Sequence, residues 1–201
     1  MKNVFKLMSL NILLITSLCF SVTTEDIYDN SWALIIGINK YKSVKKLNYA
    51  VKDAQTMQDI LLNTFAFPSE NITLLINEKA NKQSILQSFS NITKNANEND
   101  RVVIFFAGHG ETMDLPEGGE MGYLMPVDGD RNDLYLSSIG MDELKKISLM
   151  SKAKHVLYLV DACYGGIAAI GSRGLEPETT PNYIEKITKD KSRQIITAGG
   201  R

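Results

Sequence analysis

The chain has 201 residues, a length that a single domain with a sizeable core accounts for. Apolar residues make up 44% and charged residues 22%, which excludes an intrinsically disordered chain and a membrane protein with many spans. The formal net charge of −1 gives no electrostatic attraction to nucleic acid or to anionic lipid.

Residues 1–22 have the pattern of a signal peptide. The first six residues carry Lys2 and Lys6 and no acid, and residues 7–22 are apolar with small polar interruptions. This run is short for a membrane span, which needs about 20 residues. We therefore predict that residues 1–22 are cleaved and that the protein is secreted or periplasmic. The alternatives are an uncleaved membrane anchor and a lipid anchor at Cys19.

Short apolar runs alternate with amphipathic stretches after the signal segment. The pattern predicts strands at 32–38, 71–76, 101–106, 155–160 and 194–197, and helices at 50–65, 85–92 and 139–150. Residues 115–132 are rich in Gly, Pro and Asp, which predicts a long surface loop. Strands that are apolar on both faces predict an α/β domain with a mainly parallel sheet, covered by helices on each side.

The two cysteines, Cys19 and Cys163, leave a single thiol in the mature chain if the signal segment is removed. No intramolecular disulfide can then form. An unpaired cysteine in an exported protein is either buried and inert or kept for its reactivity.

Two predicted strands end in residues that carry chemistry. Strand 101–106 runs into His109 and Gly110, and strand 155–160 runs into Asp161 and Cys163. Because ligands bind at the carboxyl ends of parallel strands, we expect this histidine and this cysteine to meet. An imidazole accepts and returns the proton of a thiol nucleophile near neutral pH. The N–H groups of Gly110 and Cys163 are candidates for stabilising an oxyanion.

An apolar strand ending in His-Gly, followed by one ending in Ala-Cys, resembles the peptidase clan of caspases, metacaspases, legumain and gingipains. The gap of 54 residues from His109 to Cys163 is similar to the caspase spacing of about 50. Four further segments resemble the metacaspase and bacterial caspase-like branch: residues 32–39, residues 47–57 with Asp53, residues 123–128 and residues 193–200. The similarity predicts a caspase-like peptidase domain over residues 31–201.

This resemblance implies a caspase-like three-layer sandwich and a cysteine-type endopeptidase. Cys163 would attack the peptide carbonyl, His109 would protonate the leaving amine, and water would hydrolyse the thioester. Relatives continue beyond the position that matches Arg201 with another helix and strand. We therefore expect a C-terminally truncated domain that lacks the final helix and strand, or a partner that supplies them.

The residue two positions before the cysteine predicts the substrate. Asp161 and Cys163 face the same side of a strand, so a carboxylate beside the nucleophile favours a cationic side chain. Caspases have Gln at this position and cut after aspartate, whereas metacaspases have an acid and prefer Arg or Lys. The resemblance further implies that Asp53 forms the second side of the pocket. We expect protein or peptide substrates cleaved after Arg or Lys.

Each of these residues also has a structural interpretation. A lone cysteine at a strand end is usually a small core residue, and Asp53 or Asp161 can be an ordinary surface acid. We interpret the other histidine, His155, as a surface or edge residue. The rival functions are a catalytically silent caspase-like binding or scaffold module, a truncated inactive fragment, and a legumain-like or clostripain-like peptidase with another preferred residue.

Alternating acids at Asp128, Asp130 and Asp133 raise the possibility of a calcium site. No complete EF-hand spacing is present, no zinc-ligand spacing occurs and no nucleotide-binding motif occurs, so we expect a solvated loop and no cofactor. Residues 166–192 correspond to the linker that caspases cleave on maturation. This segment offers cleavage sites for a peptidase specific for basic residues, namely Arg173, Lys186, Lys189 and Lys191.

Overall fold

The computed structural model describes residues 27–163 and 188–198, with Cys163 described by its backbone alone. The predicted signal peptide 1–22 and most of the predicted processing linker lie outside these residues. The described elements are β1 (Ser31–Gly37), α2 (Ala50–Asn63), β2 (Ile72–Ile76), α3 (Lys82–Asn95), β3 (Arg101–Asp114), β4 (Glu120–Leu124), α4 (Leu134–Ser137), β5 (Ile139–Gly140), α5 (Met141–Met150), β6 (His155–Cys163) and β7 (Ser192–Ala198). No helix in the described ranges is long and apolar enough to cross a membrane.

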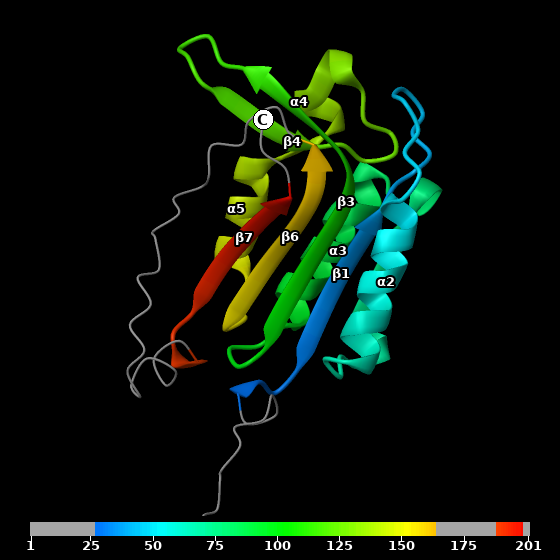
Figure 1. The fold of residues 1–201 in the computed structure, drawn as a ribbon. Helices are drawn as coiled ribbons and strands as arrows, with labels where there is room; N and C mark the ends of the chain where they lie inside the picture. Colours follow the sequence, from blue (N-terminus) through cyan, green and yellow to red (C-terminus); the bar gives the residue numbers. More distant parts are fainter. Residues whose placement is uncertain (1–26, 164–187, 199–201) are drawn as a thin grey trace, which may run out of the picture.

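A parallel sheet with the strand order β2-β1-β3-β6-β7 forms the middle layer of the molecule (Figure 1). Helix α2 packs on one face of this sheet, and helices α3 and α5 pack on the other. Strands covered on both faces need apolar side chains on both sides, which explains their nearly continuous apolar runs. The predicted three-layer α/β architecture is confirmed.

Two hydrophobic cores lie on opposite faces of the sheet because successive side chains of a strand point in opposite directions. Leu34 and Ile36 of β1 belong to the larger core beneath α3 and α5, whereas Ala33 and Ile35 belong to the smaller core beneath α2. The helices contribute apolar residues at three- and four-residue spacing. These residues are Ile85, Phe89 and Ile92 of α3, Leu144 and Ile147 of α5, and Ala50, Ala54 and Leu61 of α2.

Helix α2 approaches the end of β1 so closely that β1 must end in glycine. A Cβ atom on Gly37 would lie 2.5 Å from the carbonyl oxygen of Ala50 and 2.5 Å from the Cβ atom of Ala54. Real Cβ atoms do not come this near other heavy atoms, so any larger residue would push the helix away from the sheet. The contact fixes the first turn of α2 beside the carboxyl end of β1.

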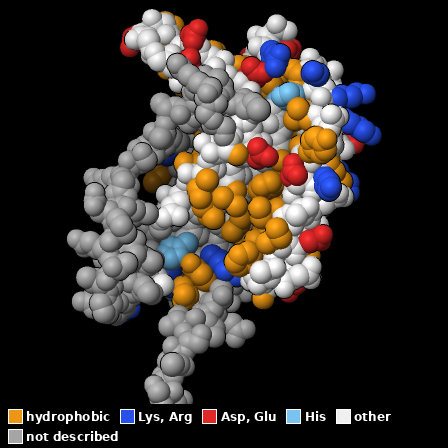
Figure 2. Space-filling view, viewed as in Figure 1, with side chains coloured by type: hydrophobic (Ala, Val, Ile, Leu, Met, Phe, Trp, Pro, Cys, Tyr) orange, Lys and Arg blue, Asp and Glu red, His pale blue; other side chains and the backbone are white. Residues whose placement is uncertain are grey.

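The part of the α2 face formed by β3, β6 and β7 carries apolar side chains that are less well covered. Val103, Leu157 and Leu159 are only partly buried, and Ile196 is 58% exposed. Apolar side chains also gather in the middle of the face seen in Figure 2. Within the described ranges, α2 packs mainly against β1, β2 and β3.

The prediction of a long surface loop at 115–132 is partly wrong. Strand β3 extends to Asp114, well beyond its predicted end at 106, and β4 pairs with this extension in antiparallel register from Gly110↔Leu124 to Asp114↔Glu120. Gly118 and Gly119 have φ of +93° and +88° at the tip, which suits glycine and closes the hairpin. The predicted helix 139–150 likewise begins only at Met141, since residues 139–140 pair with β4 as β5.

Candidate active site

His109 and Cys163 occupy paired positions on adjacent strands at the carboxyl end of the parallel sheet. The β3–β6 ladder begins at Arg101↔His155 and ends at His109↔Cys163. The backbone therefore brings together the two residues that the sequence singled out, from positions 54 residues apart.

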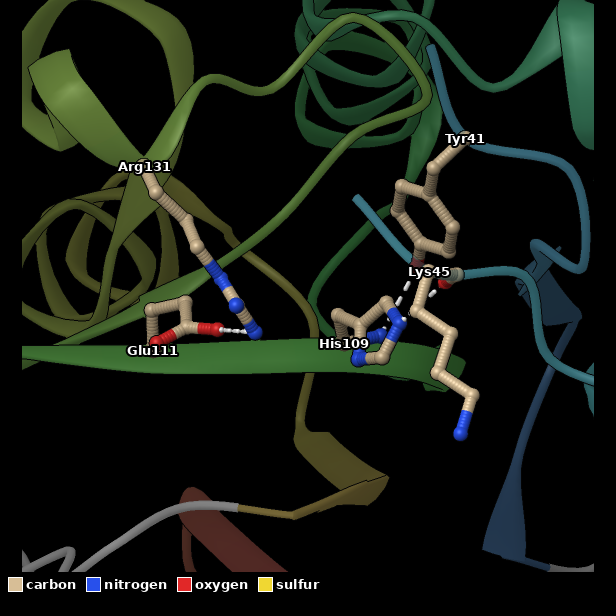
Figure 3. Close-up of polar contacts among 5 residues, drawn as sticks. All are labelled: Tyr41, Lys45, His109, Glu111 and Arg131. Atoms are coloured by element: carbon tan, nitrogen blue, oxygen red, sulfur yellow. Dashed lines mark hydrogen bonds and ion pairs between the residues drawn. The ribbon is translucent and has the colours of Figure 1, made fainter. Parts of the chain in front are cut away.

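Three hydrogen bonds from other segments hold His109, and Figure 3 shows the two that involve Tyr41 and Lys45. Its backbone N–H donates to the phenol oxygen of Tyr41 at 2.7 Å, and its backbone carbonyl accepts from the N–H of Met125 at 3.0 Å. Its ring nitrogen Nε2 lies 2.7 Å from the carbonyl oxygen of Lys45. The Tyr41 ring also packs against the imidazole, with 4.8 Å between centroids and 55° between planes.

The contact with Lys45 determines which imidazole nitrogen carries the proton. A backbone carbonyl can only accept a hydrogen bond, so Nε2 of His109 must be the donor. In the neutral ring this leaves Nδ1 as the basic nitrogen. Histidine in this tautomer can take a proton at Nδ1 while Nε2 remains anchored, which suits a general base that later acts as an acid.

Gly110 follows His109 in β3 and lies opposite Leu124 of β4. The strand continues to Glu111, whose carboxylate forms an ion pair with Arg131 (Figure 3). The hairpin of β3 and β4 therefore begins directly beside His109 and extends away from the parallel sheet (Figure 1). Gly110 is buried, in keeping with a backbone that other segments approach closely.

The two candidate specificity acids lie on the α2 side of the sheet. Asp161 pairs with Ala107 of β3, whose side chain belongs to the core beneath α2, and Asp161 itself is exposed. Asp53 is partly buried in the first turn of α2, directly before Ala54, the residue that packs closely against Gly37. Negative charge is favourable in the first turn of a helix, where backbone N–H groups point outward.

The acids that suggested calcium each accept a hydrogen bond from nearby backbone. Asp128 accepts from the N–H of Lys82, Asp130 from that of Asn132 and Asp133 from that of Leu136. Asp130 and Asp133 thereby cap the turn and short helix that follow them. Within the described residues, no group of three or more histidine, cysteine or acidic side chains is arranged to hold a metal ion.

The second histidine lies at the other end of the sheet. The hydroxyl oxygen of Tyr28 lies 2.5 Å from Nδ1 of His155, and Nε2 of His155 lies 2.9 Å from the carbonyl oxygen of Asp190. Both ring nitrogens have partners there. His155 pairs with Arg101 in the first pair of the β3–β6 ladder, whereas His109 belongs to the last pair.

Sequence reasoning did not identify Tyr41 or Lys45 as partners of His109. Tyr41 lies 68 positions and Lys45 lies 64 positions from the histidine along the chain. The Lys45 contact uses a backbone carbonyl, which every residue type possesses, so no residue pattern could have revealed it. Tyr41 left a weaker signal, namely an aromatic residue in a loop rich in lysine and asparagine.

Comparison with known proteins gives the fold and the family that the sequence predicted. Residues 30–197 match the caspase domain family. Metacaspase-1 of Eremothecium gossypii is 30% identical over 151 residues, covering 69% of this chain and 32% of that protein. Metacaspase-1A of Aspergillus oryzae is 29% identical over 148 residues, covering 68% of this chain and 34% of that protein. The chain thus spans about a third of the length of these curated relatives.

A solved structure supports the fold independently. The crystal structure of a protein from Geobacter sulfurreducens superposes with a TM-score of 0.58 at 21% identity, covering 69% of this chain and 52% of that one. A parallel sheet between helices, with histidine and cysteine positions paired at its carboxyl edge, defines a caspase-like domain. The chain belongs to the caspase domain family of cysteine peptidases, and it resembles the metacaspases among them.

Proposed function

We propose that this protein is a cysteine endopeptidase that uses His109 and Cys163 as a catalytic dyad and cleaves after Arg or Lys. The observation that carries the proposal is the pairing of these two positions at the end of the β3–β6 ladder, in a chain of the caspase domain family. The anchored Nε2 of His109 adds support, because it leaves Nδ1 basic.

The proposed reaction is a two-step acyl transfer. The thiolate of Cys163 forms a bond to the carbonyl carbon of the scissile peptide, and the N–H groups of Gly110 and Cys163 stabilise the resulting oxyanion. His109 gives the proton that it took from the thiol to the leaving amine, and the C–N bond breaks. Water then attacks the thioester with His109 as general base, releasing the carboxylic acid and restoring the thiol.

We infer the preference for Arg or Lys from Asp161 and Asp53. Both carboxylates belong to the α2 side of the sheet, one at the end of β6 and one in the first turn of α2. A cationic substrate side chain between two acids gains charge-assisted hydrogen bonds, whereas an anionic side chain is repelled. The substrates would be proteins or peptides with a basic residue at the cleaved position.

The proposal includes export, with residues 1–22 as a cleaved signal peptide and a secreted or periplasmic mature protein. Cleavage within 166–192 by the protein itself is a further part of it. Determination of the mature N-terminus from the fraction outside the cytoplasm tests the first part. Retention of residues 1–22, or recovery only from the cytoplasm, contradicts it.

Peptide hydrolysis tests the dyad and its specificity. We expect the mature chain to cleave fluorogenic peptides ending in Arg or Lys and to spare those ending in Asp or Asn, in assays with and without calcium. Replacement of Cys163 by Ala or of His109 by Ala should lower kcat by at least about 1,000-fold, since each removes a reacting group. Equal turnover by the Cys163→Ala variant contradicts the proposal.

Two other outcomes separate the alternatives. Cysteine-dependent turnover after Asp or Asn would retain the dyad and reject the role of the two acids. Binding of peptides without turnover would identify the chain as a silent caspase-like module. Persistence of fragments cut within 166–192 in the Cys163→Ala variant would assign that cleavage to another protease.

A further inference from the structure

His109 lies at a gap between two ladders on the same edge of β3. The pairing of β1 with β3 ends at Gly37↔Ala107, and the pairing of β4 with β3 begins at Leu124↔Gly110. Hydrogen bonds from Ile38 N–H to the Ala107 carbonyl and from Met125 N–H to the His109 carbonyl close the two ends of the gap. The N–H of His109 lies within the gap and needs an acceptor that neither strand provides.

Tyr41 provides that acceptor with its side chain. Its phenol oxygen accepts the His109 N–H at 2.7 Å, and the residue is only 7% exposed. The fit is close: a Cβ atom on Gly108 would lie 2.5 Å from the phenol oxygen and 3.0 Å from the ring of Phe106. Gly108 thus leaves the space in which the tyrosine hydroxyl replaces a missing strand.

The loop that carries Tyr41, residues 38–49, also carries the second contact to the histidine. The carbonyl of Lys45 accepts from Nε2 at 2.7 Å, four residues after Tyr41. One loop therefore holds both the backbone and the ring of His109. Movement of this loop would release the two contacts together.

Two asparagines hold the ends of this loop. The side chain of Asn77 accepts from the N–H groups of Asn39 and Lys40, both at 3.0 Å. The side chain of Asn39 accepts from the N–H of Val51 and donates to the carbonyl of Asn48, and its own carbonyl accepts from the N–H of Leu47. These bonds join the loop to the end of β2 and to the start of α2, as Asx contacts commonly do in turns.

We propose that Tyr41 is a positioning residue for His109: its phenol oxygen and ring, together with the Lys45 carbonyl on the same loop, hold the imidazole in the Nε2–H tautomer and in the orientation that acyl transfer requires. The inference rests on the proposed dyad and assigns the control of its base. Burial holds the pKa of Tyr41 above its usual range, so the phenol stays neutral at working pH.

The test compares Tyr41→Phe with Tyr135→Phe, a matched change at a tyrosine that is 79% exposed on α4. Phenylalanine keeps the ring contact and removes only the accepting oxygen. We expect Tyr41→Phe to lower kcat by about 10- to 100-fold with KM changed less than about twofold, because a misplaced base slows chemistry more than binding. Tyr135→Phe should leave both constants unchanged.

A second measurement reads the histidine directly. The chain has two histidines, so the ring ¹⁵N resonances of His109 can be assigned by comparison with a His155→Gln variant. We expect a single Nε2–H tautomer in the parent chain and a mixture in Tyr41→Phe. If Tyr41→Phe matches Tyr135→Phe in both kcat and the tautomer of His109, the proposal is wrong.

Further variants keep the test decisive. Should Tyr41→Phe fail to fold, Asn77→Ala, which frees the loop from β2, is expected to reproduce its tautomer mixture and loss of kcat. Asn77→Asp, which keeps an accepting oxygen, is expected to restore both. Parent-like behaviour of a folded Asn77→Ala variant counts against the role of the loop. The ¹⁵N resonances report the tautomer of His109 even in a chain that does not turn over substrate. Parent-like activity of Cys163→Ala would refute the proposed dyad, but it would not change what the resonances show about Tyr41 and His109.

Discussion

Asp161 and Asp53 reach the carboxyl edge of the sheet from different elements, one at the end of β6 and one in the first turn of α2. Neither acid belongs to a hydrophobic core. Asp161 is exposed beside its strand partners, and α2 packs on the sheet through Ala50, Ala54 and Leu61. Their charge is therefore available for substrate binding.

Replacement of either acid by its amide should selectively lower kcat/KM for substrates with a basic residue at the cleaved position. We expect Asp161→Asn and Asp53→Asn each to lower kcat/KM for peptides ending in Arg or Lys by about 10- to 100-fold, since a hydrogen bond to a charged group contributes about 1.5–3 kcal/mol. Steady-state kinetics on paired Arg and Gln peptides provide the measurement.

An acid elsewhere on α2 is the matched control. Asp59 is exposed on the same helix as Asp53, so Asp59→Asn should leave kcat/KM unchanged for every peptide. Equal losses for all three variants would indicate a general effect of charge instead of a pocket.

The pairing of the two candidate dyad positions could be predicted from the sequence because they stand at strand ends with a distinctive spacing. His109 and Cys163 were expected at one edge, and the register pairs them. The contacts that orient the histidine could not be found in this way. Tyr41 acts through a gap between two ladders, and that gap exists only once β1, β3 and β4 are assembled.

The end of α5 depends on a single arginine of β7. Arg193 donates to the carbonyl oxygens of five residues at distances of 2.8–3.2 Å, namely Ser148, Ser151, Ala153, Lys154 and Ser192. The last carbonyls of a helix have no partner within the helix, and a cation is favourable beside them. Burial lowers the pKa of Arg193, yet an arginine begins so high that it stays charged at neutral pH.

Loss of this guanidinium should destabilise the junction between α5 and β6. We expect Arg193→Met to lower the free energy of unfolding by about 2–3 kcal/mol, because several partly buried carbonyls lose a charged donor at once. Urea denaturation followed by circular dichroism measures the change.

Arg131→Met is a suitable comparison, since Arg131 is exposed and forms an ion pair with the Glu111 carboxylate. An exposed ion pair contributes at most about 1 kcal/mol. If both variants lose the same stability, the carbonyl contacts of Arg193 contribute no more than an ordinary surface charge.

Elements were easiest to predict where a strand carries a short apolar run, which holds even for the partly buried edge strands β2 and β7. The five parallel strands have apolar runs that no other element explains as well. Strand β4 was missed because its sequence, Glu-Met-Gly-Tyr-Leu, lies in a Gly-rich stretch and has only two buried residues. Its pairing depends on the extension of β3, which is a tertiary partner and not a local preference.

For the molecule as a whole, buried tyrosines make stability sensitive to alkaline pH. Burial raises the pKa of Tyr41 and of Tyr158 in the folded state. Tyr158 also accepts a hydrogen bond from the hydroxyl of Ser148. The folded chain then holds protons that the unfolded chain releases above about pH 10, so the stabilising contribution is complete below that pH and is lost as pH rises further.

We expect the free energy of unfolding to fall above about pH 10, by up to about 1.4 kcal/mol per pH unit for each of these two tyrosines. Arginines lose their protons at still higher pH, so they do not set this slope. Urea titrations at intervals between pH 8 and 11 provide the measurement.

Tyr158→Phe should reduce the fall in the free energy of unfolding with pH by the contribution of one tyrosine. Tyr135→Phe, a change at an exposed tyrosine, should leave that fall unchanged. A slope that stays flat through pH 11 in the parent chain, or one that Tyr158→Phe does not alter, would contradict the assignment. The same titration followed by tyrosine absorbance shows when the phenols ionise.

The hydrogen bond between the Lys45 carbonyl and Nε2 of His109 has a consequence for how this site tolerates genetic change. Missense substitutions at codon 45 leave the carbonyl in place, and the exposed lysine side chain takes no part in the bond. An in-frame insertion or deletion between codons 41 and 45 shifts the carbonyl relative to Tyr41 and removes the anchor. The orientation of the histidine thus depends on the length of this loop and not on which residue occupies position 45. A comparison of residue identities at that position does not detect such a dependence.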